Sequence, residues 1–272
     1  FQNLFRSRKI DIAGLQINNE IPSRIVLVRR DACGERTFGG FAGKTNNGFS
    51  DQFLQLSDIK KIWPDLSQDV SWLVLGTIPL ASETSRESVL WVVDKAREKG
   101  INIAIDVNWR PIFWDETLAS DSPPSKEVSS LIHSFLAKSS FIKLAKEEAI
   151  WFFNSVEPCK ISQSFPHKPN VIITDGSSPI KWSFDGFSGS LKVLSPDNIM
   201  DTTGAGDSFM AGLIARLSSD LSISKQYRDL QEKVRFAAAC GALVCGGVGA
   251  IDPQPTYSEV ENFLDSFSGD LS

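Results

Sequence analysis

The run Asp201-Thr-Thr-Gly-Ala-Gly-Asp-Ser-Phe209 joins a glycine turn to a carboxylate at the start of a predicted helix. Gly204, Ala205 and Gly206 allow a tight turn and present backbone N–H groups at the helix N-terminus, where the helix dipole also favours an anion. Asp207 falls in the first turn, because an apolar stripe of helical period follows it. This arrangement suggests a site that holds a phosphate group next to a carboxylate.

The role of Asp207 is open on spacing alone, since an Asp in the first turn of a helix is often only a cap. A carboxylate beside a phosphate is electrostatically unfavourable unless it takes part in the chemistry, for example by accepting a proton from an alcohol. The coincidence of the anion-binding turn and the carboxylate therefore favours Asp207 as a general base.

A second glycine-rich segment, Gly39-Gly-Phe-Ala-Gly-Lys-Thr45, resembles a P-loop but has the wrong spacing. The P-loop pattern G-x-x-x-x-G-K-[ST] would require a glycine at Phe38, and Phe lacks the backbone freedom that this glycine supplies. No helical apolar period follows in residues 45–50 either. We therefore expect a polar loop here.

The elements that would position Asp207 alternate between short apolar strands and amphipathic helices. The apolar runs predict strands at 72–75, 101–105, 141–144, 171–174 and around 193–199, and a hairpin of 180–184 with 191–194 through Asp185-Gly186. Helical periodicity covers 83–99, 125–138 with Ser125 as N-cap, 147–153, 207–219, 227–245 and 257–267. This alternation predicts an α/β fold with a mostly parallel sheet covered on both faces.

The first 50 residues follow a different pattern. Segments 24–29 and 35–38 are strand-like, and 31–34 is a predicted turn between them, which indicates a small antiparallel flap. We therefore expect a mainly β lid with its connections in residues 1–50 and an α/β body in 51–272. The chain opens at Phe1 without an initiator Met or a targeting pattern, and we expect an N-terminal part of the fold to lie upstream.

Composition excludes several functional classes. The formal charge is −5 and Lys and Arg do not cluster, which argues against nucleic-acid and anionic-membrane partners. The sequence contains no run of about 18 apolar residues, which is the length needed to span a membrane. The four cysteines (Cys33, Cys159, Cys240 and Cys245) and two histidines give no zinc pattern, and we expect small buried thiols in a reducing compartment.

The run 201–209, followed by Met-Ala-Gly-Leu213, resembles the C-terminal signature of PfkB-type, ribokinase-like carbohydrate kinases. The resemblance implies a three-layer α/β/α sandwich with a small β lid. It also implies an ATP-dependent sugar kinase, in which Asp207 deprotonates the sugar hydroxyl and the amides of Gly204, Ala205 and Gly206 hold the transferring phosphate.

Two further segments resemble substrate and metal motifs of this family. Asp106-Val-Asn-Trp-Arg-Pro-Ile-Phe-Trp114 is similar to the Asp-x-Asn-x-Arg segment of fructokinases, which makes fructose the first expected acceptor. Asn108 and Arg110 would then contact substrate or phosphate. Lys143-Leu-Ala-Lys-Glu-Glu148 resembles the segment with Asn-x-x-Glu, in which Glu148 would act on Mg²⁺ through water, although Ala145 replaces the Asn.

Other segments resemble nucleotide and lid motifs. Thr174-Asp-Gly176 is similar to a turn that binds ATP with Thr174, Gly176 and Gly206. Residues 236–242 resemble the helix beside adenine, with Ala238 where many members have Asn. Residues 245–251 resemble a loop that holds a monovalent cation together with Asp201 and Thr203 in some relatives. Residues 35–38 resemble part of the lid.

Several alternatives stay open. Ala145 and Ala238 favour a non-catalytic scaffold subunit with a kinase fold, whereas the intact run 201–207 favours an enzyme. Other acceptors are ribose, a nucleoside or a sugar acid, because the expected sugar-binding loop lies upstream. Besides ATP and Mg²⁺, the resemblance leaves K⁺ and a homodimer through the lid as options. An intracellular location is expected, in the cytoplasm or the plastid stroma.

Overall fold

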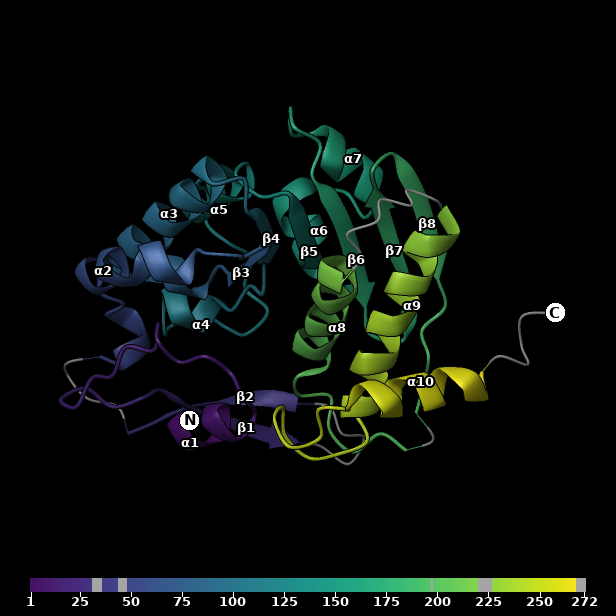
Figure 1. Cartoon of the computed structure of the whole chain (residues 1–272), viewed down its shortest axis with the longest axis horizontal. Coiled ribbons are helices and arrows are strands. Elements are labelled where there is room, and N and C mark those ends of the chain that lie inside the picture. The colour runs from purple at the N-terminus through teal and green to yellow at the C-terminus, as the bar shows by residue number, and fades with distance from the viewer. Residues whose placement is uncertain (31–35, 44–47, 197, 220–226, 268–272) are drawn as a thin grey trace. The chain divides into compact units, whose positions relative to one another are not determined.

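The computed structural model describes residues 1–30, 36–43, 48–196, 198–219 and 227–267, with the backbone alone for 28–30 and 36–39. These residues belong to two units. The first combines Phe1–Leu27 with Gly40–Ser139, and the second combines Val28–Gly39 with Ser140–Ser272. Each unit has its own strands and helices, and each is described by itself below (Figure 1).

The first unit contains a parallel strand pair flanked by helices. Strand β3 (Trp72–Gly76) pairs with β4 (Asn102–Asp106) in the register Trp72↔Asn102 to Gly76↔Asp106. The other elements are α1 (Gln2–Ser7), η1 (Ser50–Gln52), α2 (Leu56–Leu66), η2 (Ile78–Ala81), α3 (Glu83–Glu98), α4 (Pro111–Trp114) and α5 (Lys126–Leu136). The side chains of Ile103 and Ile105 in β4 and of Val89 and Val93 in α3 form part of the core.

A two-stranded sheet of β1 (Ile25–Arg30) and β2 (Arg36–Ala42) corresponds to the predicted flap. The chain passes from one unit to the other within each of these strands, between Leu27 and Val28 and between Gly39 and Gly40. The predicted turn at 31–34 and Glu35 lie outside the described residues, as do Lys44 and Thr45 of the P-loop-like segment.

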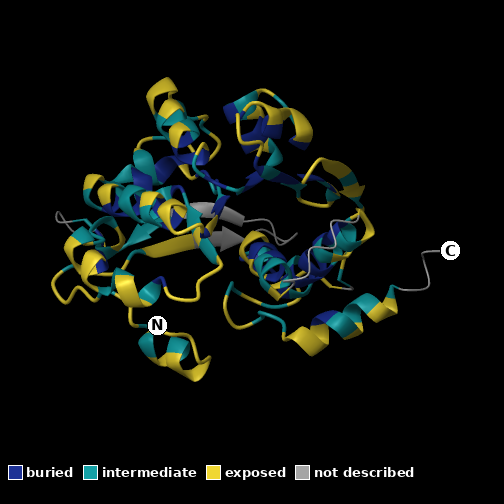
Figure 2. Ribbon diagram, turned by 45° about the horizontal axis from the view of Figure 1, so that its top comes forward, coloured by how far each residue is buried: buried dark blue, intermediate teal, exposed yellow. Residues whose placement is uncertain are grey.

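The second unit contains the remaining strands. Strand β5 (Phe141–Ala145) is parallel to β6 (Asn170–Asp175), and β6 continues into the antiparallel strands β7 (Ser178–Phe184) and β8 (Phe187–Leu191). The helices are α6 (Lys146–Phe153), α7 (Pro158–Gln163), α8 (Ala205–Ser219), α9 (Tyr227–Val244) and α10 (Tyr257–Ser266). Buried residues gather in β5, β6 and β7 and on the inner faces of α8 and α9 (Figure 2).

Most predicted elements are confirmed within a few residues of their expected ends, and the Ser125 cap accepts a hydrogen bond from the Val128 amide. The prediction of a strand at 191–194 was wrong. Asp185 and Gly186 both have positive φ, as a two-residue hairpin turn requires, so the partner strand begins directly at Phe187. The prediction of a strand around 193–199 was also wrong, since the described residues of that segment form no strand.

Four short or interrupted helices were not predicted, namely α1, α2, α4 and the six-residue α7. Helix α1 has no buried face, α4 is only four residues long, and α2 contains Pro64, a residue that normally ends helices. None of the helices in the described ranges combines the length and apolar character needed to cross a membrane.

The cysteines follow the sequence expectation in part. Cys240 and Cys245 are buried free thiols, whereas Cys159 is exposed, and Cys33 lies outside the described residues. Within the ranges that the structure describes, no group of three or more His, Cys, Asp or Glu side chains could hold a metal ion.

Candidate active site

The turn before α8 requires glycine at position 204. Gly204 has a φ of +83°, and a Cβ at this residue would lie 2.8 Å from Ala250 Cβ and 2.9 Å from Ala250 Cα. The amide of Ser208 donates to the Gly204 carbonyl at 2.8 Å, which closes the first helical turn. Asp207 therefore lies in the first turn as predicted, and both Gly206 and Asp207 are exposed. The amide of Ala205 donates to the Thr202 carbonyl at 3.3 Å, whereas Gly206 and Asp207 are at first-turn positions whose amides an α-helix leaves without internal acceptors.

A buried carboxylate fixes the loop that leads into this turn. Asp201 Oδ1 accepts from the Thr203 amide at 3.0 Å and from Thr203 Oγ1 at 2.6 Å, and Oδ2 accepts from the Gly249 amide at 3.0 Å. The Asp201 side chain thus ties residues 201–203 to the loop after α9. Because the loop is held on two sides, the glycine turn is preorganised before any ligand binds.

Small residues let α8 and α9 pack closely side by side (Figure 1). A Cβ on Gly212 would lie 2.6 Å from Cys240 Sγ, and one on Gly241 would lie 3.0 Å from the Ala205 carbonyl oxygen. Ser208 Oγ donates to the Cys240 carbonyl at 3.0 Å. Burial raises the pKa of the Cys240 thiol to about 11, so the sulfur acts as a packing group rather than a nucleophile.

Lys143 is a residue next to this turn to which no role was assigned from the sequence. It lies in β5, its side chain belongs to a residue only 6% exposed, and its Nζ is 3.3 Å from the position that a Cβ on Gly206 would occupy. A buried lysine is rare, because removing the ammonium group from water is costly. The sequence signal was present, since Lys143 interrupts the otherwise apolar strand Phe141-Ile-Lys-Leu144.

Glu148 is also buried, at 4% exposure, and so is not a solvated helix glutamate. Its Oε2 accepts a hydrogen bond from the Ala145 amide at 2.8 Å, which caps the start of α6. Ala145 is the register partner of Thr174 in the parallel pair β5–β6. Glu148 and Thr174 therefore lie at the same carboxyl edge of this sheet.

The end of β6 and the turn after it carry two of the residues predicted to bind ATP. Thr174 is partly buried, with Oγ1 3.5 Å from the Leu144 carbonyl, and Gly176 has a φ of +51°. Between them, Asp175 Oδ2 accepts from Lys146 Nζ at 2.9 Å. The hydrogen bond to Asp175 raises the pKa of Lys146, and the same bond holds the pKa of Asp175 below its ordinary value.

Asn108 and Arg110 belong to the first unit, where they follow the carboxyl end of β4. Asn108 has a φ of +45°, a strained region for a non-glycine residue and one often found at functional sites. The Thr77 hydroxyl, buried at the end of β3, donates to the Val107 carbonyl and supports this bend. Arg110 is exposed and donates from Nη1 to the Trp109 carbonyl at 2.8 Å.

The predicted site residues thus form two groups. Asp201, Thr203, the turn 204–207, Thr174, Gly176 and Glu148 belong to the second unit, and Asn108 and Arg110 belong to the first. Ala238 is buried in α9. Of the expected lid segment, Glu35 is outside the described residues, and the side chains of 36–38 are not described.

Comparison with known proteins identifies relatives over nearly the whole chain. A family model described as "pfkB family carbohydrate kinase" matches residues 1–257. The "Probable fructokinase-6, chloroplastic" of Arabidopsis thaliana is 27% identical over 266 residues, which cover 96% of this chain and 65% of that protein. The chain thus spans slightly less than two thirds of the length of this relative.

Solved structures with the same fold include two fructokinases. A double mutant of the Vibrio cholerae O395 enzyme, solved in a form with fructose, ADP and potassium ion, matches with a TM-score of 0.77 and 24% identity, covering 97% of this chain and 79% of that one. The Xylella fastidiosa fructokinase with bound ATP matches with a TM-score of 0.82 and 20% identity, covering 98% and 80%. These matches confirm the predicted α/β, ribokinase-like fold.

Proposed function

The chain belongs to the pfkB family of carbohydrate kinases, and we propose that its protein transfers the γ-phosphoryl group of ATP to a hydroxyl group of a sugar. The start of α8 carries this proposal. There, the Gly204–Gly206 turn, the adjacent Asp207 carboxylate and the Lys143 ammonium group beneath Gly206 combine an anion site with a candidate base. A helix cap alone would need neither a glycine with positive φ nor a buried lysine.

Asp207 acts as the general base in the proposed reaction. It accepts the proton of the sugar hydroxyl while the hydroxyl oxygen forms a bond to the γ-phosphorus and the bond from that phosphorus to the bridging oxygen of ADP breaks. The exposed position of Asp207 in the first turn of α8 leaves its carboxylate accessible to an acceptor. The helix amides of residues 204–206 and the charge of Lys143 stabilise the negative charge of the transferring group.

The nucleotide is bound in this proposal by the edge formed by β5 and β6. Thr174 at the end of β6 and Gly176 in the turn after it contact ATP, and Gly206 contributes its amide. The ion pair between Lys146 and Asp175 holds this turn in place. In the first unit, the proposed role of Arg110 is to orient phosphate oxygens, and that of the bend at Asn108 is to present substrate-binding groups.

The donor chemistry of the buried carboxylates suits two cations. When bound, Mg²⁺ neutralises charge on the phosphate oxygens of ATP, and Glu148, a buried oxygen donor at the sheet edge, is the residue that would hold it through water. Asp201 and Thr203 offer a carboxylate and a hydroxyl oxygen in one loop, a hard donor set suited to a monovalent cation such as K⁺.

Fructose is the proposed acceptor, because relatives over nearly the whole chain are named fructokinases. A specific observation also supports a second candidate function, a non-catalytic subunit with a kinase fold. Ala145 and Ala238 are apolar at two positions where polar groups are expected, and Ala238 is buried. The acceptors ribose, a nucleoside and a sugar acid remain the alternatives within the kinase proposal.

The test is sugar-dependent release of ADP by the complete protein, with ATP, Mg²⁺ and K⁺ present and fructose, ribose, a nucleoside and a sugar acid offered in turn. We expect the highest kcat/KM with fructose. A higher value for another acceptor would keep the kinase and change the substrate. Absence of ADP release with every acceptor, together with intact folding, would support the scaffold function instead.

A further inference from the structure

Arg24 lies directly before β1, and its guanidinium group is enclosed by three aromatic rings of the first unit. The guanidinium carbon is 4.5 Å from the centroid of Phe41, 4.4 Å from that of Phe49 and 4.6 Å from that of Phe113. Only 8% of the Arg24 side chain is exposed. We call Arg24, Phe41, Phe49, Phe113 and the carboxylate of Asp51 the Arg24 cage.

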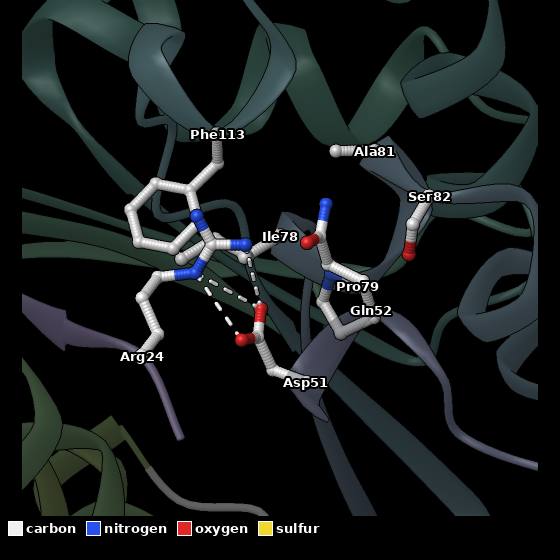
Figure 3. A pocket seen from close by; sticks show the side chains of 8 residues that line it. All are labelled: Arg24, Asp51, Gln52, Ile78, Pro79, Ala81, Ser82 and Phe113. Atoms are coloured by element: carbon white, nitrogen blue, oxygen red, sulfur yellow. Dashed lines mark hydrogen bonds and ion pairs between the residues drawn. The ribbon is translucent and has the colours of Figure 1, made fainter. Parts of the chain in front are cut away.

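Asp51 completes the cage with a two-point ion pair. Arg24 Nε donates to both Asp51 oxygens at 3.2 Å, and Nη2 donates to Oδ2 at 3.1 Å (Figure 3). The planar guanidinium group can therefore stack on rings and hold the carboxylate with its edge at the same time, which the ammonium group of a lysine cannot do. The Asp51 side chain is 42% exposed, so this carboxylate stays in contact with water.

The cage joins segments that are far apart in the sequence. Arg24 directly precedes the first residue of β1, and Phe41 is the second-to-last residue of β2. The cage therefore contacts the start of β1 and the end of β2. Phe49 and Asp51 lie on the connection that follows the β1–β2 sheet. Phe113 comes from α4, and its amide donates to the Arg110 carbonyl at 3.1 Å.

Phe113 brings the cage to the segment 108–113. This segment carries Asn108, with its strained backbone, and Arg110. Helix α4 has only four residues, too few to hold its position by internal hydrogen bonds. Its placement therefore depends on side-chain contacts, among them the ring of Phe113 over Arg24 (Figure 3) and the Phe41–Phe113 ring contact at 5.2 Å.

We propose that Arg24 is a positioning residue that fixes residues 25–27 and 40–42, the part of the β1–β2 sheet within the first unit, to the segment 108–113 of the same unit. The kinetic part of this inference rests on the proposed kinase function, whereas the structural part does not. A small cavity of about 40 Å³ adjoins the cage between Gln52, Pro79 and Ser82, and it leaves room beside Arg24 for water.

The test compares Arg24→Met with Lys61→Met in the complete protein. Methionine keeps an unbranched side chain but removes the positive charge and the planar set of N–H donors of the guanidinium group. Lys61 is a matched control, since it pairs with Asp58 at 3.0 Å in the same unit but is largely exposed. Hydrogen exchange is measured at residues 25–27, 40–42 and 111–114, with 170–175 of the second unit as an internal reference.

We expect exchange at all three test segments to rise about tenfold or more in Arg24→Met, and to stay unchanged at 170–175 and throughout Lys61→Met. In the kinase assay, Arg24→Met should raise the KM for the acceptor or lower kcat by about tenfold, because misplacement of a binding group has effects of this size or larger. Arg24→Lys should recover only part of the lost activity, since lysine restores the positive charge without the planar N–H donors that bind Asp51 at two points.

Unchanged exchange at 111–114 in Arg24→Met would overturn the proposal, because the cage would then not hold that segment. An equal rise at 170–175 would overturn it too, since the effect would be general destabilisation. If Arg24→Met does not fold, Phe113→Leu takes its place and must raise exchange at 25–27 and 40–42. A wild-type protein without kinase activity would contradict the proposed function alone, and the exchange result would still decide the role of Arg24.

Discussion

The start of α8 and the Arg24 cage hold functional segments by different means. Around α8, glycine geometry, the hydrogen bonds of Asp201 and the close approach of α9 fix a turn whose residues are nearly continuous in the sequence. The Arg24 cage instead gathers side chains from four separate segments around one cation. A rigid backbone turn suits an anion site that must be preorganised, whereas side-chain contacts suit a junction that sets the position of neighbouring segments.

The largest effect on this comparison is expected from Gly204→Ala. The added methyl group would meet Ala250 within 2.9 Å, and the residue would be held at a φ of +83°. We expect a loss of about 2–4 kcal/mol in the free energy of unfolding, from left-handed backbone strain and overpacking together, and a loss of most kinase activity. Urea denaturation and the ADP-release assay measure the two effects.

Gly100→Ala is the matched control for this change. Gly100 has a similar φ of +72°, but a Cβ there would meet nothing within 4 Å. It should therefore show the backbone cost alone, about 1–2 kcal/mol, with normal activity. Equal losses of stability in the two variants would show that Ala250 does not constrain the turn.

Lys143→Met should have the next largest effect. It removes the buried positive charge beneath Gly206 while keeping the bulk of the side chain. We expect kcat to fall by about 10- to 100-fold, as for the loss of one group that stabilises charge in the transition state. The measurement is kcat and KM for ATP, with Lys138→Met as control, because Lys138 is a partly exposed lysine paired with Asp94. A normal kcat in a folded Lys143→Met protein would remove Lys143 from the site.

A smaller effect is expected from the Lys146–Asp175 pair. The pKa of Lys146 is raised above its ordinary 10.5, so its contribution to stability is complete below that pH and is lost as pH rises through the raised value. The pKa of Asp175 is lowered below 3.8, so its contribution is present above that pH and is lost as pH falls through the lowered value. The stability difference between wild type and Lys146→Met should thus be constant from about pH 5 to 9.

The same variant should raise the KM for ATP by about two- to threefold, since an exposed ion pair contributes little to the stability of the turn. Denaturation curves across the pH range and ATP titrations at pH 7 provide the measurements. A stability difference that changes steeply near neutral pH would mean that another group, rather than this pair, holds the turn.

The smallest predicted effect concerns thiol reactivity. Among the described cysteines, exposed Cys159 should react with a thiol reagent at pH 8, whereas buried Cys240 and Cys245 should not, because the pKa of Cys240 is raised to about 11. Peptide mapping after labelling identifies the sites. Gly212→Ala should expose Cys240 to labelling, since the new methyl group would lie 2.6 Å from its sulfur. Rapid labelling of Cys240 in the wild type would contradict the close packing of α8 and α9.

The contrast between the two regions also explains what could be predicted from the sequence. The turn before Asp207 is local, so its glycine spacing and the apolar stripe after it were sufficient to place the start of α8. The alternation of apolar strands and amphipathic helices likewise predicted the α/β class. Local rules worked here because each element is specified by its own residues.

Long-range contacts set the features that were missed. The Arg24 cage depends on residues 24, 41, 49, 51 and 113, and no local pattern connects them. Gly206, to which the Lys143 side chain lies close, is likewise 63 positions away in the chain. The second strand of the hairpin was placed too late, because Phe187-Ser-Gly-Ser-Leu191 has little apolar character and the turn geometry alone decides its start.

The central claim is that Asp207 is the general base, and Asp207→Asn in the complete protein tests it most directly. The amide is nearly isosteric with the carboxylate and can cap α8, but it cannot accept the proton of the acceptor hydroxyl. We predict that kcat falls by about 10²–10⁴-fold while ATP binding and the melting temperature stay close to those of the wild type. Near-normal turnover in a folded Asp207→Asn protein would contradict the account and return Asp207 to the role of a helix cap.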